Sequence, residues 1–301
     1  MKTIRDAQFV PAWIDMTPQV PEPRIDWIEE KYLDLAYGED PLQRLDLYLP
    51  PHAEKPLPLV VLVHGGGFCL CDKRDWHLYP GFYALREGFA LASVNYRLAP
   101  AARFPAPVED LKAALRFLRA QAGRYGLRTQ DVFLYGTSAG GNLVTLAGLQ
   151  NAGTPEAVAG VAALCPLLDF ENQWTHVQTA ACGPKEREML FASVVQYLGA
   201  APDEDAPLAR RAGAREYITP KAPPFYLQHG TLDPGVPVEQ SREFAAQLRA
   251  VCGGGAVTLD LMEGVAHAGG GPEFLEEEHI LPILGFFRTL CREAPQKGEG
   301  C

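Results

Sequence analysis

Hydrophobic residues in this chain fall into short continuous runs, which alternate with longer segments that have one apolar and one polar face. Residues 59–63 are apolar at every position, which is typical of a strand buried on both faces of a sheet. Residues 45–49 alternate instead, as a half-exposed strand does. Further strands are predicted at 89–94, 131–135, 157–164, 225–228 and 256–261, with helices at 76–87, 108–122, 138–149, 238–250 and 280–291. This alternation predicts an α/β fold with a mainly parallel central sheet flanked by helices on both faces.

The regularity of the pattern also divides the chain. Residues 1–40 are rich in proline and are expected to form an N-terminal arm, packed down by Trp13 and Trp27. Residues 41–292 are predicted to form one domain. Within it, residues 170–221 have the least regular pattern and are expected to make a small cap insertion, and residues 293–301 are expected to be a flexible tail.

Composition and net charge exclude several classes of binding partner and cofactor. A net charge of −10 repels phosphate backbones and anionic lipids, so no nucleic acid and no membrane partner is expected. No run of eighteen apolar residues is uninterrupted and residues 1–13 carry no secretory pattern, so a cytoplasmic location is expected. The seven cysteines include no C-x-x-C pair and no His/Cys cluster with zinc spacing, so neither a metal nor another cofactor is expected.

A serine stands between a predicted strand and a predicted helix. Residues 136–140, Gly-Thr-Ser-Ala-Gly, fit the G-x-S-x-G pattern of a nucleophile on a strained turn, which small neighbours allow to close. Free N–H groups at the start of the helix then face developing negative charge. A plain glycine-rich turn is the alternative, but the flanking elements favour a nucleophile at Ser138.

A second glycine-rich segment follows the buried strand at 59–63. Residues 64–68 read His-Gly-Gly-Gly-Phe, and three glycines let backbone amides approach an oxyanion with no side chain in the way. A flexible loop and a phosphate cradle are the alternatives, but no Lys-Ser/Thr pair follows, as it does in a P-loop. His64 is expected to shape the loop and not to act in catalysis.

An acid and a histidine follow two later predicted strands. Asp233 lies after the strand at 225–228, where it can orient an imidazole, although a role as a turn residue is the local alternative. His267 lies just beyond the strand at 256–261, whereas His279 falls in a charged helical stretch. The order serine, acid, histidine is that of α/β-hydrolases. We therefore expect Ser138 as the nucleophile, His267 as the base and Asp233 as its orienting acid.

Taken together, these motifs resemble those of the hormone-sensitive lipase family of α/β-hydrolases and of related microbial carboxylesterases, such as acetylxylan and feruloyl esterases. The resemblance covers roughly residues 25–290 and includes Asn-Tyr-Arg-Leu-Ala-Pro at 95–100, followed by Phe-Pro-Ala-Pro-Val-Glu-Asp at 104–110. It implies an α/β-hydrolase fold and, by position, oxyanion N–H groups on Gly66, Gly67 and Ala139. The short N-terminal arm and Ala101-Ala102-Arg103 depart from many relatives, which affects the expected cap and not the chemistry.

The implied reaction is hydrolysis of short-chain acyl, acetyl or hydroxycinnamoyl esters, including those of plant-wall carbohydrate, through an acyl-enzyme. The expected partners are a small-molecule ester and at most a second copy of the chain in a homodimer. Asp169 and Glu263 are rivals for the role of the acid. A serine peptidase of prolyl-oligopeptidase type and a catalytically silent ligand-binding relative remain alternatives. A histidine base of ordinary pKa predicts activity that rises through about pH 6 to 7.

Overall fold

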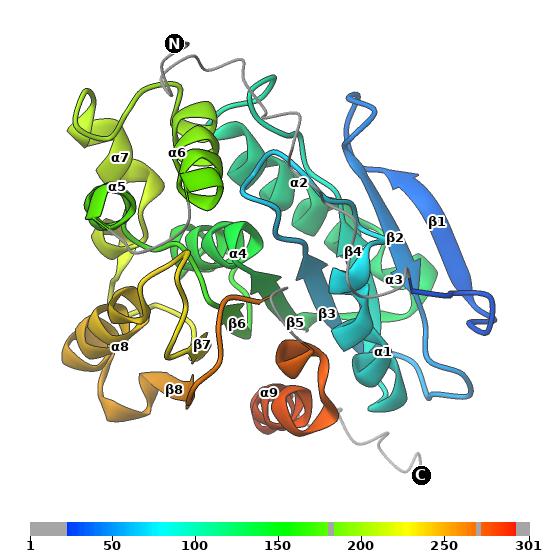
Figure 1. The fold of residues 1–301 in the computed structure, drawn as a ribbon. Coiled ribbons are helices and arrows are strands. Elements are labelled where there is room, and N and C mark those ends of the chain that lie inside the picture. Colours follow the sequence, from blue (N-terminus) through cyan, green and yellow to red (C-terminus); the bar gives the residue numbers. More distant parts are fainter. Residues whose placement is uncertain (1–22, 180–183, 269–271, 293–301) are drawn as a thin grey trace, which may run out of the picture.

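An eight-stranded sheet runs through the centre of the protein (Figure 1). The computed structural model describes residues 23–179, 184–268 and 272–292. The strands are β1 Lys31–Ala36, β2 Arg44–Tyr48, β3 Leu57–Val63, β4 Ala90–Val94, β5 Leu127–Thr137, β6 Gly160–Leu164, β7 Phe225–Gly230 and β8 Val257–Met262. Their spatial order is β1-β2-β4-β3-β5-β6-β7-β8. Only the pairs β1–β2 and β2–β4 are antiparallel, so the prediction of a mainly parallel sheet is confirmed.

Helices cover both faces of this sheet (Figure 1). Buried residues of α1 Tyr79–Arg86 and α9 Glu277–Leu290 belong to one hydrophobic cluster. Those of α2 Ala106–Ala120, α4 Ala139–Gln150 and α8 Val238–Cys252 belong to the other. The short elements are α3 Ala122–Tyr125 and the 3-10 turns η1 Trp76–Leu78, η2 Arg215–Tyr217, η3 Gly254–Ala256 and η4 Glu273–Leu275.

Strand β3 shows why two clusters form. Leu59, Val61 and Val63 point into the cluster under α2 and α4. Val60 and Leu62 point into the cluster under α1 and α9. Because successive side chains of a strand face opposite sides, a strand covered on both faces must be apolar at every position, as the sequence of residues 59–63 predicted.

The expected N-terminal arm differs from the structure in one element. Residues 31–36 form β1, the edge strand that pairs with β2. Its side chains are half-buried or exposed, so no apolar run announces it, and backbone pairing holds it in place. Trp27 meets the edge of Phe82 with 5.3 Å between ring centroids, but 54% of Trp27 stays exposed. Trp13 and the expected tail at 293–301 lie outside the described residues.

The segment at 170–221, which has the least regular pattern and is expected to make a small cap, contains three helices. They are α5 Phe170–Thr179, α6 Pro184–Leu198 and α7 Ala206–Ala212, and they group at one end of the sheet (Figure 1). Phe170, Trp174 and Val177 lie three or four positions apart and are all buried. This spacing is a helical signal that the sequence interpretation missed.

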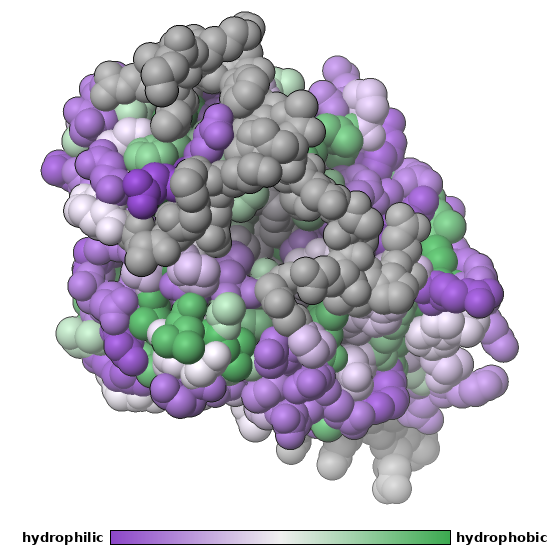
Figure 2. Space-filling view, in the orientation of Figure 1, coloured by the Kyte–Doolittle hydropathy of each residue, from purple (hydrophilic) through white to green (hydrophobic). Residues whose placement is uncertain are grey.

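The visible surface is mainly hydrophilic, with a smaller apolar area near α8 and β7 (Figure 2). A hydrophilic surface agrees with the net charge of −10. Among the helices of the described residues, none is long and apolar enough to cross a membrane.

The aromatic contact between α9 and the sheet provides a test of the packing. Phe287 is fully buried and stacks on Phe133 of β5, with 4.7 Å between ring centroids. Phe287→Ala is expected to lower the free energy of unfolding by about 3–5 kcal/mol, measured by urea denaturation, because it leaves a cavity in a dense core. Val251→Ala, at a position on α8 that is 40% exposed, is the control and should stay within about 0.5 kcal/mol of wild type. Similar losses in both variants would contradict this packing.

Candidate active site

Four loops at the carboxyl ends of parallel strands bring the expected residues together. The glycine-rich loop follows β3, Ser138 follows β5, Asp233 lies three residues after β7, and His267 lies five residues after β8. Parallel strands end at the same edge of a sheet, which is where α/β proteins bind their ligands.

Ser138 lies on a strained turn between β5 and α4. Its backbone is left-handed, with φ of 56°, which is costly for a residue that has a Cβ atom. The turn closes only because glycines flank it. A Cβ atom on Gly136 would lie 2.4 Å from the carbonyl oxygen of Gly140, and one on Gly140 would lie 2.2 Å from that of Val63. The Ser138 side chain does not cap α4, so its hydroxyl is available to another partner.

That partner is His267, which connects the serine to the acid. Nε2 of His267 lies 2.9 Å from Oγ of Ser138. Nδ1 of His267 lies 2.6 Å from Oδ2 of Asp233. The three side chains, far apart in sequence, therefore form one continuous hydrogen-bonded chain. With Nδ1 donating to the carboxylate, Nε2 is left to accept the serine hydroxyl proton.

The buried Asp233 carboxylate also accepts hydrogen bonds from groups other than His267. Its Oδ1 accepts the backbone N–H groups of Gly235 and Val236, each at 2.8 Å. Its Oδ2 lies 3.2 Å from Nε2 of His229. His229 is itself fully buried, and its Nδ1 lies 2.7 Å from Oγ of Ser241. The sequence interpretation gave His229 no role, although its position at the end of β7, four residues before Asp233, is a signal that could have found it.

Charges and hydrogen bonds within this site shift the pKa values of Asp233 and His267. Burial raises the pKa of Asp233, but the charge of His267 and hydrogen bonds from His229 and His267 outweigh it and hold that pKa well below its ordinary value. Burial lowers the pKa of His267. The Cys165 sulfur and the Asp233 carboxylate raise it by more than burial lowers it, so the pKa lies well above 6.5. The base therefore differs from the ordinary histidine expected from the sequence, and it loses its proton at a higher pH.

The loop after β3 lies beside the serine. A Cβ atom on Gly65 would lie 3.4 Å from Cβ of Ser138. Gly66 and Gly67 have φ of 92° and 57°, the left-handed region that favours glycine. Ala139, the third expected donor, is the first residue of α4 and directly follows Ser138. The expected donors thus come from two segments, the loop after β3 and the start of α4.

His64 and Tyr96 hold this loop in shape. The His64 ring stacks on the Tyr96 ring at 4.5 Å, and the Tyr96 hydroxyl lies 3.1 Å from the carbonyl oxygens of both His64 and Gly65. Burial lowers the pKa of His64 to about 4, so the ring is neutral. The neighbouring Arg97 forms a charged pair with buried Asp110, with 2.7 Å between Nη2 and Oδ1. The segments at 95–100 and 104–110 therefore help to hold the glycine-rich loop in position beside Ser138.

Cys165, at the end of β6, is a site residue that the sequence interpretation missed. It is fully buried, and its Sγ, a ring nitrogen of His267 and a carboxylate oxygen of Asp233 all lie within 4.8 Å of one another. Its position directly after a buried strand, at the edge where the other site residues gather, could have found it.

Helix α6 forms a roof over the site. Cβ of Ser193 lies 3.0 Å from the place that a Cβ atom on Gly67 would take. Cδ2 of Leu190 lies 3.8 Å from the corresponding place on Gly235, and Cγ of His267 lies at the same distance from it. One helix therefore reaches from the glycine-rich loop to the loop that carries Asp233.

The rival residues lie in other contacts. Asp169 pairs with Arg215 at 2.9 Å and accepts the backbone N–H of Asn172. His279 lies 3.7 Å from the exposed Glu278 on α9. Among the described residues, no hydrogen bond joins Glu263 to the ring of His267, whose two nitrogens face Asp233 and Ser138. The hydrogen bonds to Ser138 thus run through His267 and Asp233, and not through Asp169, Glu263 or His279.

Comparison with known proteins adds to this geometry. The BD-FAE family profile matches residues 45–248. Esterase LipC of Mycobacterium tuberculosis is 31% identical over 229 residues, which are 72% of this chain and 55% of LipC. Esterase LipQ of the same organism is 30% identical over 82% of this chain and 58% of its own length. The chain thus spans about half the length of these curated relatives.

Among solved structures, a bifunctional GH43-CE protein of Bacteroides eggerthii is 26% identical with a TM-score of 0.74, over 87% of this chain and 38% of that one. A truncated carbohydrate esterase from gut microbiota is 20% identical with a TM-score of 0.77, over 90% of this chain and 99% of that one. The second likeness shows the fold, and the family match covers more than half of the chain. This protein therefore belongs to the BD-FAE family, whose members resemble hormone-sensitive lipase, and it has the α/β-hydrolase fold.

Proposed function

We propose that this protein hydrolyses carboxylic esters, with Ser138 as the nucleophile, His267 as the general base and Asp233 as the acid that orients it. The observation that carries the proposal is the unbroken chain of hydrogen bonds from Oγ of Ser138 through His267 to Asp233. The names of the relatives, esterases LipC and LipQ, support the same reaction class.

The proposed reaction has two acyl-transfer steps. Nε2 of His267 takes the Ser138 proton while Oγ attacks the ester carbonyl carbon, and the imidazolium that forms is stabilised by Asp233. His267 then gives that proton to the departing alcohol, which leaves Ser138 acylated. A water molecule, deprotonated in turn by His267, attacks the acyl-enzyme. His267 returns this proton to Oγ of Ser138 as the acyl bond breaks, and the carboxylic acid leaves.

We propose that the N–H groups of Gly66, Gly67 and Ala139 bind the oxyanion of both tetrahedral intermediates. Two supports are the left-handed backbone of the glycines and the position of Ala139 at the start of α4. Donors fixed before the reaction lower the barrier because they need no reorganisation when charge develops.

The substrate is proposed to have a short acyl group or a compact aromatic acid, on a sugar-like alcohol. The roof that Leu190 and Ser193 place over the site supports the short acyl group. One solved structure with the same fold is named a carbohydrate esterase, which supports the sugar-like alcohol. Phe170, Trp174 and Tyr197 do not add support for a sugar-like alcohol, because they are buried in the core and cannot stack on a sugar ring.

Removing the nucleophile or the base should abolish hydrolysis. Ser138→Ala and His267→Ala are each expected to reduce kcat on an aryl ester about a million-fold, because either loss stops the attack on the carbonyl. Ser138→Ala should also fail to react with a fluorophosphonate probe. His279→Ala is the control and should stay within a few-fold of wild type. A Ser138→Ala variant that keeps a tenth of the activity, or a severe loss in His279→Ala, would overturn the assignment.

The pH profile tests the acid. Protonated His267 cannot accept a proton, so kcat/KM should rise with pH through the pKa of His267, above its ordinary 6.5. Asp233→Asn removes the charge that raises this pKa. The rise should therefore move to lower pH, and the plateau should fall by about a thousand-fold or more. Asp169→Asn should change neither. If Asp169→Asn were severe and Asp233→Asn mild, the acid would be Asp169.

A series of acyl esters of one alcohol tests the substrate. With kcat/KM as the measurement, acetyl and butyryl esters should exceed octanoyl and palmitoyl esters by about tenfold or more, because a long chain collides with the roof. Leu190→Ala should reduce the ratio of short-chain to long-chain kcat/KM, since it shortens an α6 side chain that lies beside Gly235 on the Asp233 loop. A maximum at octanoyl or longer in the wild-type enzyme would refute the short acyl group. Release of acetate or ferulate from plant-wall oligosaccharide tests the alcohol.

A further inference from the structure

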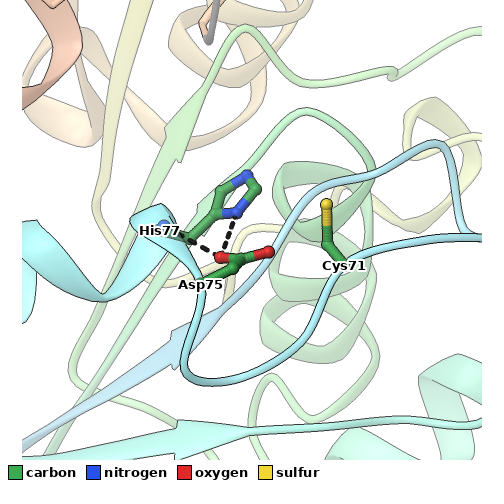
Figure 3. Close-up of side chains that lie close together, drawn as sticks. All are labelled: Cys71, Asp75 and His77. Carbon is green, nitrogen blue, oxygen red and sulfur yellow. Dashed lines mark hydrogen bonds and ion pairs between the residues drawn. The ribbon is translucent and has the colours of Figure 1, made fainter. Parts of the chain in front are cut away.

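Three side chains gather on the loop between the glycine-rich segment and α1. Cys71, Asp75 and His77 each offer a sulfur, oxygen or nitrogen atom, and these atoms all lie within 4.8 Å of one another. Figure 3 shows the His77 ring above the Asp75 carboxylate, with the Cys71 thiol to one side of both. Nδ1 of His77 lies 2.7 Å from Oδ1 of Asp75, and the backbone N–H of His77 donates to the same oxygen at 2.9 Å.

These three donor types are those that Zn²⁺ prefers in proteins. A thiolate, an imidazole nitrogen and a carboxylate oxygen at about 2.0–2.3 Å complete three of the four positions of a tetrahedral site. The sequence interpretation considered only cysteine and histidine spacings, so it missed a set whose third member is an aspartate. All three residues lie within residues 71–77.

We propose that Cys71, Asp75 and His77 form a Zn²⁺ site, with a water molecule as the fourth ligand. The ion replaces the thiol proton of Cys71, which leaves to solvent. Before the ion binds, Nδ1 of His77 donates its hydrogen to Asp75. On binding, the proton of His77 shifts from Nδ1 to Nε2, so that Nδ1 and the carboxylate oxygen both face the ion. The net exchange is one bound Zn²⁺ for one released proton.

The surroundings of the cluster suit an ion that enters from solvent. The His77 side chain is 4% exposed, whereas the Asp75 side chain is 19% exposed, so one ligand is fixed in the interior and another is reachable. The Trp76 ring stacks on His77 with 3.7 Å between centroids. Asn95 holds the loop from the other side, with its Oδ1 2.6 Å from the backbone N of Lys73. Ligands held by such contacts lose little freedom on binding.

The cluster lies against the glycine-rich loop. A Cβ atom on Gly66 would lie 2.8 Å from Sγ of Cys71, and one on Gly65 would lie 2.9 Å from Nε2 of His77. An ion held by these two side chains would brace the segment that carries the proposed oxyanion donors. The binding itself does not depend on the proposed esterase reaction, so it is tested by a readout other than activity.

A second cluster must be removed from the test. Cys165, Asp233 and His267 also have donor atoms within 4.8 Å of one another, but two of them belong to the proposed catalytic chain. A Cys165→Ser parent removes the thiol from that cluster. The full-length parent is titrated with Co²⁺, whose bond to a thiolate gives a charge-transfer absorption in the near ultraviolet.

The parent is expected to show this absorption, and Zn²⁺ should displace it. Adding Cys71→Ser should abolish the band, whereas adding the matched Cys69→Ser should retain it. Asp75→Asn should weaken binding by about tenfold or more. Zn²⁺ should also raise the thermal midpoint of the parent and not that of the Cys71→Ser variant, because a ligand of the folded state stabilises it.

Absence of the absorption in the parent, or an equal band in the parent with Cys71→Ser, would overturn the site. If Cys71→Ser fails to fold, as judged by circular dichroism, Asp75→Asn decides the question: unchanged Co²⁺ affinity in that variant refutes the proposal.

Discussion

At the turn after β5, the start of α4 lies against the loop that leaves β3, so closely that a Cβ atom on Gly140 would come within 2.2 Å of the Val63 carbonyl oxygen. The same constraint recurs at the end of β7, where a Cβ atom on Gly230 would lie 2.3 Å from the Val265 carbonyl oxygen. These two close backbone contacts place Ser138 beside the glycine-rich loop and Asp233 beside the loop that carries His267. The hydrogen-bonded chain of the site depends on both, because it joins residues from three separate loops.

The buried carboxylate of Asp233 shows how the charges of the site are balanced. Removing a charge from water is costly unless hydrogen bonds replace the lost hydration. Two backbone N–H groups and the ring of His267 supply them, and His229 supplies a further contact. Because Ser241 contacts the other nitrogen of the His229 ring, that ring is held in one orientation and helps to fix the carboxylate. The fixed carboxylate in turn favours the tautomer of His267 in which Nε2 can accept the serine proton.

Much of this arrangement could be predicted from the sequence, because the strongest patterns have direct physical causes. A strand buried on both faces must be apolar throughout, and residues 59–63 are. A nucleophile on a closed turn needs glycine neighbours, as at Gly136 and Gly140. His267 followed from chain order and from its place after a buried strand.

Other parts could not be read from local pattern. Strand β1 has no buried face of its own, and backbone pairing with β2 decides its position. The contacts of His229 and Cys165 depend on how distant loops meet, although both residues stand at strand ends. The pKa of His267 depends on neighbours that only the fold assembles. The helices of 170–221 had a usable signal in Phe170 and Trp174, which the polar residues between them obscured.

The position of Ser193 on α6, whose Cβ lies 3.0 Å from the place that a Cβ atom on Gly67 would take, has a consequence for how the cap can change. In many enzymes a cap can be exchanged as an independent module, since it touches the substrate and not the machinery below. Here helix α6 comes so close to the glycine-rich loop that a side chain on Gly67 would collide with Ser193. A cap exchanged between relatives must therefore bring a small side chain to the position of Ser193, or it will displace the loop on which it rests.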